Sequence, residues 1–381
     1  MRSLKNSHLG HSLYYAVVNH TTPSNLTYAW NFGSLAFLCL GIQIVTGLLL
    51  AAHYDPEVGR AFESVEHIMR DVPGGWLVRY GHANGASMFF VVVYTHVLRG
   101  VYYTSYVWPR RAAWALGVVL FVLLMATAFV GYVLPWGQMS LWGATVITNL
   151  VSAVPYVGDT VLVWLWGGYS VGGPTLSRFY ALHFILPFLM VFVAGLHTVA
   201  VQYAGSSNPV GATLAEDAVP FTPYYLVKDL WGFVLFGLVY AGLVFWAPNL
   251  LGHPDNYIKA DPLVTPPHIV PEWYFLPFYA ILRSVPDKGL GVLAMGGAIA
   301  ALVALPVLPG GDHQSRQFRP LSRVLFWWFV WGGIYLGWLG GQPVSVAFET
   351  DSAHAALWYF FYFAALPFVD RAESFVGRYR G

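Results

Sequence analysis

Long apolar runs separated by short polar stretches dominate this chain of 381 residues. A helix that crosses a bilayer needs about 20 mainly apolar residues, and eight segments reach that length. They lie near residues 31–53, 76–104, 113–134, 177–204, 225–246, 288–308, 322–340 and 351–369. The pattern therefore predicts an all-α integral membrane protein with eight transmembrane helices.

The stretch between the third and fourth spans is apolar but interrupted. It reads "WGQMSLWGATVITNLVSAVPYVGDTVLVWLWGG" at residues 136–168. Because glycine and proline break helices, we predict short interfacial helices in this outer loop and no further span. A ninth span here would invert the orientation of every later segment.

Composition narrows the class of protein. Hydrophobic residues make up 57% of the chain and charged residues only 10%, against roughly 25% charged in soluble proteins. A net charge of +1 provides no basic field for nucleic acid, and the single cysteine, Cys39, excludes an internal disulfide framework. The polar, mixed first thirty residues resemble neither a secretory signal nor an Arg-rich transit peptide, so we expect direct membrane insertion.

The distribution of basic residues predicts the orientation. Eight crossings return the chain to its starting side, so both termini lie on one side of the membrane. Of the 19 Lys and Arg residues, 12 fall on that side and 7 on the other. By the positive-inside rule, the termini face the cytoplasm or the mitochondrial matrix.

Four histidines lie inside predicted spans, where ionisable side chains are costly and usually functional. His82 and His96 are fourteen residues apart in the second span, as are His183 and His197 in the fourth. Fourteen residues make nearly four helical turns, roughly 21 Å, so each pair shares one helix face. Because the two helices run parallel, we expect His82 to face His183 near the outer surface, and His96 to face His197 nearer the inner one.

Two facing histidines can bind one haem iron axially and leave no free coordination position, which suits electron transfer. Buried histidines that only hydrogen-bond to neighbouring helices are the simpler alternative, and the better one for a single histidine. For two matched pairs, we interpret the pattern as metal ligation. The prediction is two stacked b-type haems inside a bundle of the first four spans.

Glycines recur with the same spacing in the first and third spans. Gly33 and Gly47 are fourteen residues apart, as are Gly117 and Gly131. A planar porphyrin needs room beside a helix backbone, and only glycine leaves that room. Both spans start on the inner side, so Gly33 and Gly117 fall at the inner haem level, and the other two at the outer level.

Arginines stand close to two of the histidines. Arg79 lies three residues before His82, and Arg99 three residues after His96. Arginine pairs well with carboxylates, so these two side chains are candidates for binding haem propionates. Ordinary snorkelling at the ends of spans is the alternative.

Long motifs resemble the cytochrome b family, the haem-bearing core of ubiquinol–cytochrome c oxidoreductase (respiratory complex III), in its mitochondrial form. They span essentially the whole chain: "GHANGASMFF", "GYVLPWGQMSLWGATVITNL", "RFYALHFILPF", "GSSNPVG", "PPHIVPEWYFLPFYAILRS" and "FRPLS". The chloroplast form is split into two chains, with one extra residue between its second pair of histidines. The unsplit chain and the spacing of fourteen favour the respiratory type.

The resemblance implies a homodimeric enzyme of the mitochondrial inner membrane. It would oxidise ubiquinol at the outer side, passing one electron to a Rieske iron–sulfur protein and on to a c-type cytochrome, within a complex of further subunits. The other electron would cross the two haems and reduce ubiquinone at the inner side, with coupled proton translocation. Both termini would then lie in the matrix.

The resemblance also assigns an outer quinol site around "PEWY". A carboxylate beside an apolar pocket can accept the protons of quinol oxidation, so Glu272 and Tyr132 are the catalytic candidates. Aromatic rings pack well on a flat quinone. The matching pocket positions are Phe129, Gly143, Tyr274 and Tyr279. The alternative is that Glu272 only holds the loop or contacts a partner.

An inner quinone site follows from the same resemblance. Its residues here are Asn31, Gln202, Ser206, Lys228 and Asp229. The family commonly has a histidine five residues after the last haem ligand, and this chain has Gln202. Glutamine can donate the hydrogen bond but carries no proton at neutral pH, which leaves the proton route at this site open.

Two domains are predicted: a di-haem domain over residues 1–210 and a C-terminal transmembrane domain over residues 211–381 that carries the outer-loop motif. Two other classes share some of these features. A di-haem membrane anchor of a dehydrogenase would have the histidines but no need of "PEWY". A solute transporter could use intramembrane histidines for proton coupling.

Overall fold

Eight long helices occupy the segments that the apolar runs predict. The computed structural model describes residues 20–212, 217–308 and 315–378, with side chains up to residue 375. Within these residues the long helices are α3 (Phe32–Ala51), α5 (Gly75–Tyr102), α6 (Arg111–Val133), α9 (Gly173–Ala204), α10 (Phe221–Trp246), α12 (Lys288–Ala304), α13 (Pro320–Gly340) and α14 (Val346–Arg378).

Six helical segments of the described residues are long and apolar enough to cross a membrane. They are Tyr28–Ala51, Arg111–Val133, Gly173–Ala204, Phe221–Trp246, Lys288–Val307 and Val346–Phe375. Helices α5 and α13, of 28 and 21 residues, have the length but a more polar or tryptophan-rich composition. The coarse prediction of a multi-span helical membrane protein is confirmed.

Shorter helices fill the connections, and in the described part of the chain none of them reaches the length of a span. They are α4 (Ala61–Arg70), α7 (Gln138–Asn149), α8 (Gly158–Trp166), α11 (Leu276–Arg283), and the 3-10 helices η2 (Tyr28–Asn31), η3 (Leu150–Ala153), η4 (Pro254–Tyr257), η5 (Trp273–Phe275), η6 (Leu305–Val307) and η7 (Arg316–Phe318). Helices α7 and α8 have 12 and 9 residues, against the 20 or so that a span requires. The prediction of short helices in this loop is confirmed.

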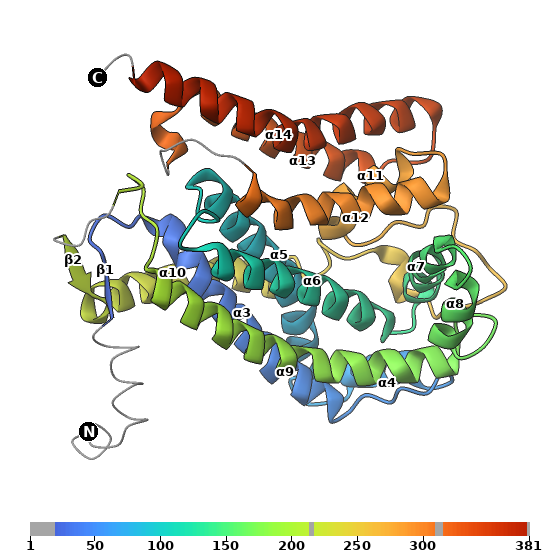
Figure 1. The fold of residues 1–381 in the computed structure, drawn as a ribbon. Coiled ribbons are helices and arrows are strands. Elements are labelled where there is room, and N and C mark those ends of the chain that lie inside the picture. The colour runs from blue at the N-terminus through green and yellow to red at the C-terminus, as the bar shows by residue number, and fades with distance from the viewer. Residues whose placement is uncertain (1–19, 213–216, 309–314, 379–381) are drawn as a thin grey trace.

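A two-stranded sheet shows that α3 and α10 begin at the same end of the helices. Strand β1 (Thr21–Pro23) precedes α3, strand β2 (Ala218–Pro220) precedes α10, and the two pair antiparallel. The four long helices α3, α5, α6 and α9 therefore bring the chain back to the end at which it started. The number of crossings between the start of α3 and the start of α10 is thus even. Both strands and the end of α14 lie at one end of the molecule, and α7 and α8 at the other (Figure 1).

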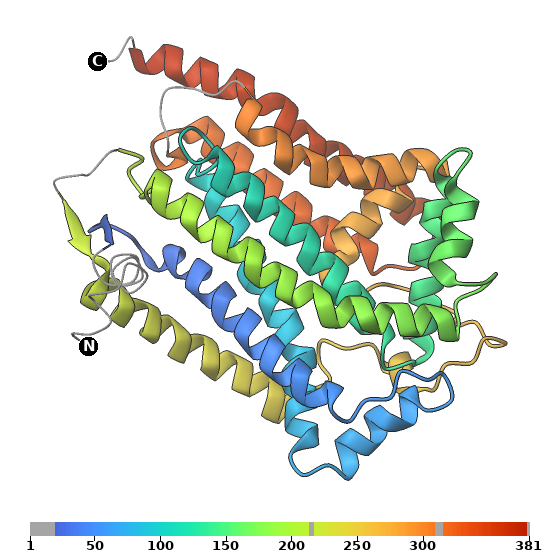
Figure 2. The ribbon, with the colours of Figure 1, turned by 60° about the horizontal axis from the view of Figure 1, so that its bottom comes forward.

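The helices that carry the histidines are each packed on a helix that carries the glycines. Helix α5 packs on α3, and α9 packs on α6. Figure 2 shows α6 and α9 running side by side with α3 beyond them. This arrangement sets two helix pairs facing each other, with His82 and His96 on one side and His183 and His197 on the other.

Helix α9 begins at Gly173, four residues before the predicted span. Pro174 stands in its first turn, where a missing N–H costs nothing, and the Thr175 hydroxyl accepts a hydrogen bond from the Gly172 N–H at 3.1 Å. These local contacts extend the helix beyond its apolar run, so hydropathy alone places the start too late.

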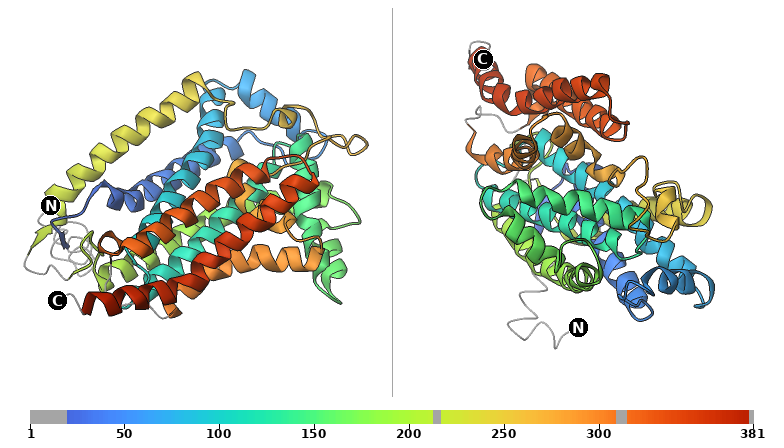
Figure 3. Two further views of the ribbon diagram at one scale, coloured as in Figure 1. Left: turned by 90° about the horizontal axis from the view of Figure 1, so that it is seen from above. Right: turned by 90° about the vertical axis from the view of Figure 1, so that its right-hand side faces the viewer.

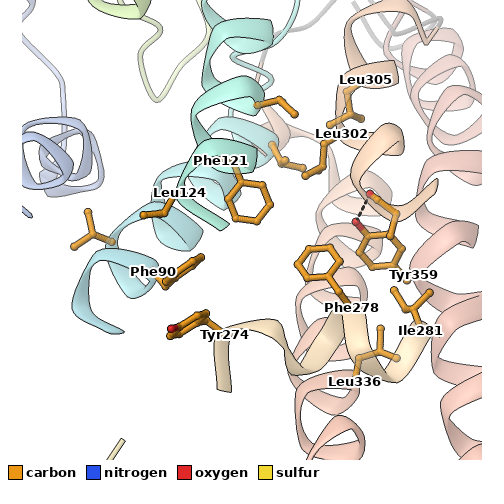
Figure 4. Packing of buried hydrophobic residues seen from close by; sticks show 14 of the residues in the cluster. Phe90, Phe121, Leu124, Tyr274, Phe278, Ile281, Leu302, Leu305, Leu336 and Tyr359 are labelled. Atoms are coloured by element: carbon orange, nitrogen blue, oxygen red, sulfur yellow. Dashed lines mark hydrogen bonds between the residues drawn. The ribbon is translucent and has the colours of Figure 1, made fainter. Parts of the chain in front are cut away.

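The C-terminal helices form a layer on one side of the histidine-bearing helices. Helices α11, α13 and α14 pack on one another, and α12 lies between this layer and α6, as the end-on view of Figure 3 shows. The Trp114 indole of α6 donates to the Leu302 carbonyl of α12 at 2.7 Å, and the Tyr359 hydroxyl of α14 donates to the Ala298 carbonyl at 2.8 Å (Figure 4). The predicted boundary at 210/211 stays a prediction; α10, beyond it, packs on α3 and α5.

A buried ion cluster joins the start of α13 to α14. Arg316 and Arg319 are 0% and 3% exposed, and their Nη1 atoms lie 3.5 and 3.1 Å from Asp370 Oδ1. Both arginines were counted among the 12 basic residues of the terminal side. They compensate a buried carboxylate and do not face lipid headgroups, while three more of the 12, at positions 2, 5 and 380, lie outside the described residues.

Candidate functional site

The outer histidines face each other across the bundle. The ring centroids of His82 on α5 and His183 on α9 are 6.0 Å apart, with the ring planes at 86°. A metal–imidazole bond is about 2 Å long, so two imidazoles on opposite sides of one metal have centroids about 6 Å apart. The gap therefore has the width of a single metal atom with two axial imidazoles.

The inner pair of histidines has nearly the same geometry as the outer pair. The ring centroids of His96 and His197 are 6.3 Å apart, with the planes at 67°. Within the described residues, no group of three or more His, Cys, Asp or Glu side chains could hold a metal ion. Two ligands for each site suit a metal whose other positions are filled by a macrocycle.

Each of the four glycines lies against the histidine of its own level. A Cβ atom at Gly33 would lie 3.4 Å from His96 Cε1, and one at Gly117 would lie 3.2 Å from His197 Cε1. At the outer level, a Cβ at Gly47 would lie 3.1 Å from His82 Cε1. Gly131 is the tightest, with only 2.3 Å to His183 Cε1. The glycines thus make room for the edges of the imidazole rings.

Backbone carbonyls orient two of the histidine rings. His183 Nδ1 lies 2.9 Å from the Thr127 carbonyl, and His197 Nδ1 lies 2.8 Å from the Ala113 carbonyl. A carbonyl only accepts hydrogen bonds, so each Nδ1 must carry the proton. That tautomer leaves Nε2 unprotonated and able to bind a metal.

Arg99 makes His96 different. Arg99 Nη2 lies 3.3 Å from His96 Nδ1, and a guanidinium can only donate. For Nε2 of His96 to bind a metal, Nδ1 must carry a proton, so this contact has to be released. The Arg99 guanidinium lines the inner cavity, and its buried Nε has no hydrogen-bond partner, which fits a carboxylate bound there.

Both histidine pairs open into cavities of cofactor size. A cavity of about 540 Å³ surrounds His82 and His183, and Arg79, Tyr132 and Glu272 also line it. A second cavity, of about 520 Å³, surrounds the inner pair. Its further lining includes Asn31, Arg99, Gln202, Ser206 and Asp229. With the histidine spacing and the glycines, these cavities fit a haem at each level.

Glu272 is a buried carboxyl group in the outer loop. It directly precedes η5 and lines the same cavity as the outer histidines. Burial raises the pKa of Glu272 to about 7, although the Tyr132 hydroxyl and Arg79 favour its ionised form. A carboxyl group with such a pKa can take up and release protons near neutral pH.

Helix α5 holds the segment that carries Glu272. The Tyr274 ring stacks on Phe90 with centroids 3.9 Å apart and planes at 4° (Figure 4). The Tyr94 hydroxyl donates to the Tyr274 carbonyl, and the Trp273 indole donates to Ser87 Oγ at 3.1 Å. The helix that bears His82 and His96 therefore also positions the carboxyl group.

Three residues predicted for the outer site lie away from this cavity. Phe129 packs on Phe179, with centroids 5.8 Å apart. The Arg283 guanidinium lies 4.7 Å from the centre of the Tyr279 ring. A Cβ at Gly143 would meet nothing within 4 Å. Their roles toward quinol stay predictions.

The inner residues fall into two groups. Asn31, Gln202, Ser206 and Asp229 line the inner cavity, whereas the Lys228 ammonium donates to the Leu26 carbonyl and lies 4.9 Å from the centre of the Tyr28 ring. Lys228 therefore does not line the cavity that its neighbour Asp229 lines.

Ser34 is an inner residue that the sequence analysis missed. Its hydroxyl lies 2.7 Å from Asp229 Oδ1 and 2.8 Å from the Asn31 carbonyl. It also lines the cavity. Ser34 follows Gly33, but a serine in an apolar run usually bonds within its own helix, so nothing in the sequence distinguished it.

The fold and the site together define the class of protein: a polytopic α-helical membrane protein with two stacked histidine pairs between facing helices. Comparison with known sequences gives the family. The family described as "Cytochrome b/b6/petB" matches residues 17–205, and the one described as "Cytochrome b(C-terminal)/b6/petD" matches residues 259–360. The chain belongs to the cytochrome b/b6 family, as its motifs predicted.

Curated relatives cover nearly the whole chain. Cytochrome b of Arabidopsis thaliana is 55% identical over 369 residues, which is 97% of this chain and 94% of the relative. Cytochrome b of Chondrus crispus is 52% identical over 375 residues, 98% of this chain and 96% of the relative. A solved structure described as "Hyperthermophilic respiratory Complex III" is 33% identical with a TM-score of 0.92, covering 98% of this chain and 99% of the solved one.

Proposed function

We propose that this protein is the electron-carrying membrane subunit of respiratory complex III, a ubiquinol–cytochrome c oxidoreductase. The observation that carries the proposal is the two imidazole gaps, 6.0 and 6.3 Å between ring centroids, one above the other in one helix bundle. Family membership favours this function over the solute transporter and the dehydrogenase anchor.

His82 and His183 would hold the outer haem, and His96 and His197 the inner one. Each haem, when bound, would supply a one-electron redox centre. Arg79 and Arg99 line the two cavities and would bind the propionates. The four glycines leave the space that the rings and the macrocycles need.

Glu272 would accept a proton from ubiquinol at the outer side. The Glu272 carboxyl group lines an apolar cavity together with Tyr132 and the outer histidines. The proton acceptor and the proposed haem ligands would therefore both lie close to the bound ubiquinol. At the inner side Asp229, held by Ser34, would supply a proton to the quinone.

The topology proposed with this function has eight spans, α5 and α13 included, with both termini in the matrix of mitochondria. The proposed partners are a second copy of this chain, a Rieske iron–sulfur protein, a c-type cytochrome subunit and further subunits of the complex. The solved complex III that the chain resembles supports an assembly of this kind.

A reduced-minus-oxidised optical spectrum with stepwise redox titration tests the proposal. The purified protein should contain two haems that titrate as two one-electron components. Quinol–cytochrome c activity of the assembled complex then separates this function from the dehydrogenase anchor. A protein without haem absorbance would refute the proposal.

Glu272→Gln keeps the shape of the side chain and removes the base. We expect turnover to fall more than tenfold, since positioned bases contribute roughly 10²–10⁴-fold. In the unmodified protein the rate should fall as the pH drops through about 7, because protonated Glu272 cannot accept a proton. The variant should lack that step.

The control for this prediction is Glu57→Gln, at a side chain that is 58% exposed, which should change neither rate nor pH profile. Steady-state quinol oxidation from pH 5.5 to 9 provides the measurement. An unchanged rate and profile in Glu272→Gln would make Glu272 a loop anchor, with Tyr132 or water as the next candidate acceptor.

Gln202 should hydrogen-bond the inner quinone. Gln202→Ala is expected to weaken quinone or inhibitor binding by about 1 kcal/mol, the value of one hydrogen bond. Gln202→His should leave the haem spectrum unchanged and add a step near pH 6.5 to inner-haem reoxidation, the usual pKa of histidine being about 6.5. Tyr203→Ala, at a ring that is 93% exposed, is the control. If neither Gln202 variant alters inner-site binding or kinetics, the side chain does not contact the quinone.

A further inference from the structure

The hydroxyl of Thr46 contacts the outer ligand His82 from helix α3. Thr46 Oγ1 lies 2.9 Å from His82 Nδ1 and 2.6 Å from the Ile42 carbonyl. A carbonyl cannot donate, so the single hydroxyl proton of Thr46 points to a backbone carbonyl, that of Ile42 or that of Gln43 at 3.3 Å. The hydroxyl oxygen is therefore the acceptor toward His82, and His82 Nδ1 carries the proton.

A second contact fixes the backbone of the same ligand. The Gln43 amide, one turn before Thr46, donates to the His82 carbonyl at 3.1 Å. Residues 43 and 46 lie on one face of α3, next to Gly47, against which the ring edge packs. Helix α3 thus sets both the position and the rotation of His82.

The other three ligands are oriented differently. His183 and His197 donate to backbone carbonyls, and His96 faces a guanidinium. Among the four histidines, only His82 has a side-chain acceptor on Nδ1 within the described residues. A side chain can be exchanged, whereas a backbone carbonyl cannot.

We propose that Thr46 is a positioning residue of the outer haem site, which holds His82 in its metal-binding tautomer and tunes the reduction potential of the outer haem. The inference rests on the haem ligation proposed above. Accepting a hydrogen bond from Nδ1–H makes an imidazole a more basic ligand, and a more basic ligand favours the more highly charged, oxidised iron. Loss of the Thr46 acceptor should therefore raise the outer potential.

The test compares three variants in the assembled complex by redox titration of the two haems. Thr46→Val replaces the hydroxyl by a methyl group, and Thr46→Ser keeps it. Thr350→Val is the matched control, because the Thr350 hydroxyl likewise donates to the carbonyl four residues earlier, Val346, at 2.8 Å. Thr350 lies on α14 and lines neither of the two cavities.

In Thr46→Val the outer potential should rise and the inner one stay unchanged. Removal of partners of metal ligands typically changes affinity about 10–100-fold; a tenfold change in the oxidised-to-reduced ratio is about 59 mV for one electron. Thr46→Ser and Thr350→Val should both titrate like the unmodified protein. Loss of the outer haem in Thr46→Val alone would also support the proposal, since it would show that His82 is misplaced.

An unchanged outer potential in Thr46→Val with full haem content would overturn the proposal, as would equal shifts in Thr46→Val and Thr350→Val. A shift in Thr46→Ser as large as that in Thr46→Val would overturn it too, because the hydroxyl would then have no role. Failure of the haem proposal itself is distinct: the unmodified protein would then lack two redox components.

Discussion

Replacing His82 or His183 by alanine should remove the outer haem proposed above and leave the inner one, and replacing His96 or His197 should do the reverse. Each proposed haem site would lose one of its two imidazole ligands, which would weaken its hold on the haem. Each variant should therefore keep half of the haem and one redox component, as measured by pyridine haemochrome content and optical titration.

His67→Ala provides the control for these four variants. His67 lies on α4, where it pairs with Asp71 at 2.9 Å, and its side chain is 56% exposed. This variant should keep both haems. Two redox components surviving in any of the four ligand variants would contradict the pairing across the bundle.

Alanine at Gly131 should empty the outer site, while alanine at Gly33 should lower the haem content of the inner site much less. The new Cβ would lie 2.3 Å from His183 Cε1 in the first case and 3.4 Å from His96 Cε1 in the second. The first distance forces the ligand ring out of place, and overpacking of this kind costs about 1–3 kcal/mol. The second is an ordinary contact.

Haem content of the purified variants measures this difference. Gly131→Leu should have a stronger effect than Gly131→Ala and block haem insertion or assembly of the complex. Equal haem content in Gly131→Ala and Gly33→Ala would mean that the His183 ring can move aside, and that Gly131 serves helix packing.

The stacking of the two histidine pairs could be predicted from the sequence, because it depends on helical periodicity alone. Fourteen residues return to the same face of a helix, so the levels of His82 and His183, and of Gly47 and Gly131, follow from spacing and direction. The helical segments were equally predictable, since length and hydropathy suffice to find a span.

Residues whose role depends on the direction in which one side chain points were harder to predict. Lys228 and Asp229 are neighbours, yet only Asp229 lines the inner cavity, because successive helix positions point in different directions. Thr46 stands in an apolar run, where a threonine usually bonds back to its own helix; its second contact, to His82, exists only because α3 packs on α5.

The loop around Glu272 illustrates the same limit. Its burial comes from contacts with Ser87, Phe90 and Tyr94 on α5, more than 170 residues earlier in the chain. No local pattern around "PEWY" reveals that these three side chains, one helical turn apart, form its support. The amphipathic helix α4 was missed because ten residues are too few for a hydropathy search for spans.

The pairing of β1 with β2 also sets an order of events during biosynthesis. Thr21 pairs with Pro220, so about 200 residues must be made before the strands can meet, which takes on the order of 10–40 s at 5–20 residues per second. His20, Thr22 and Phe221 from these two strand segments line the inner cavity. This part of the inner cavity wall can therefore form only after all four histidines, the last of them His197, have been made.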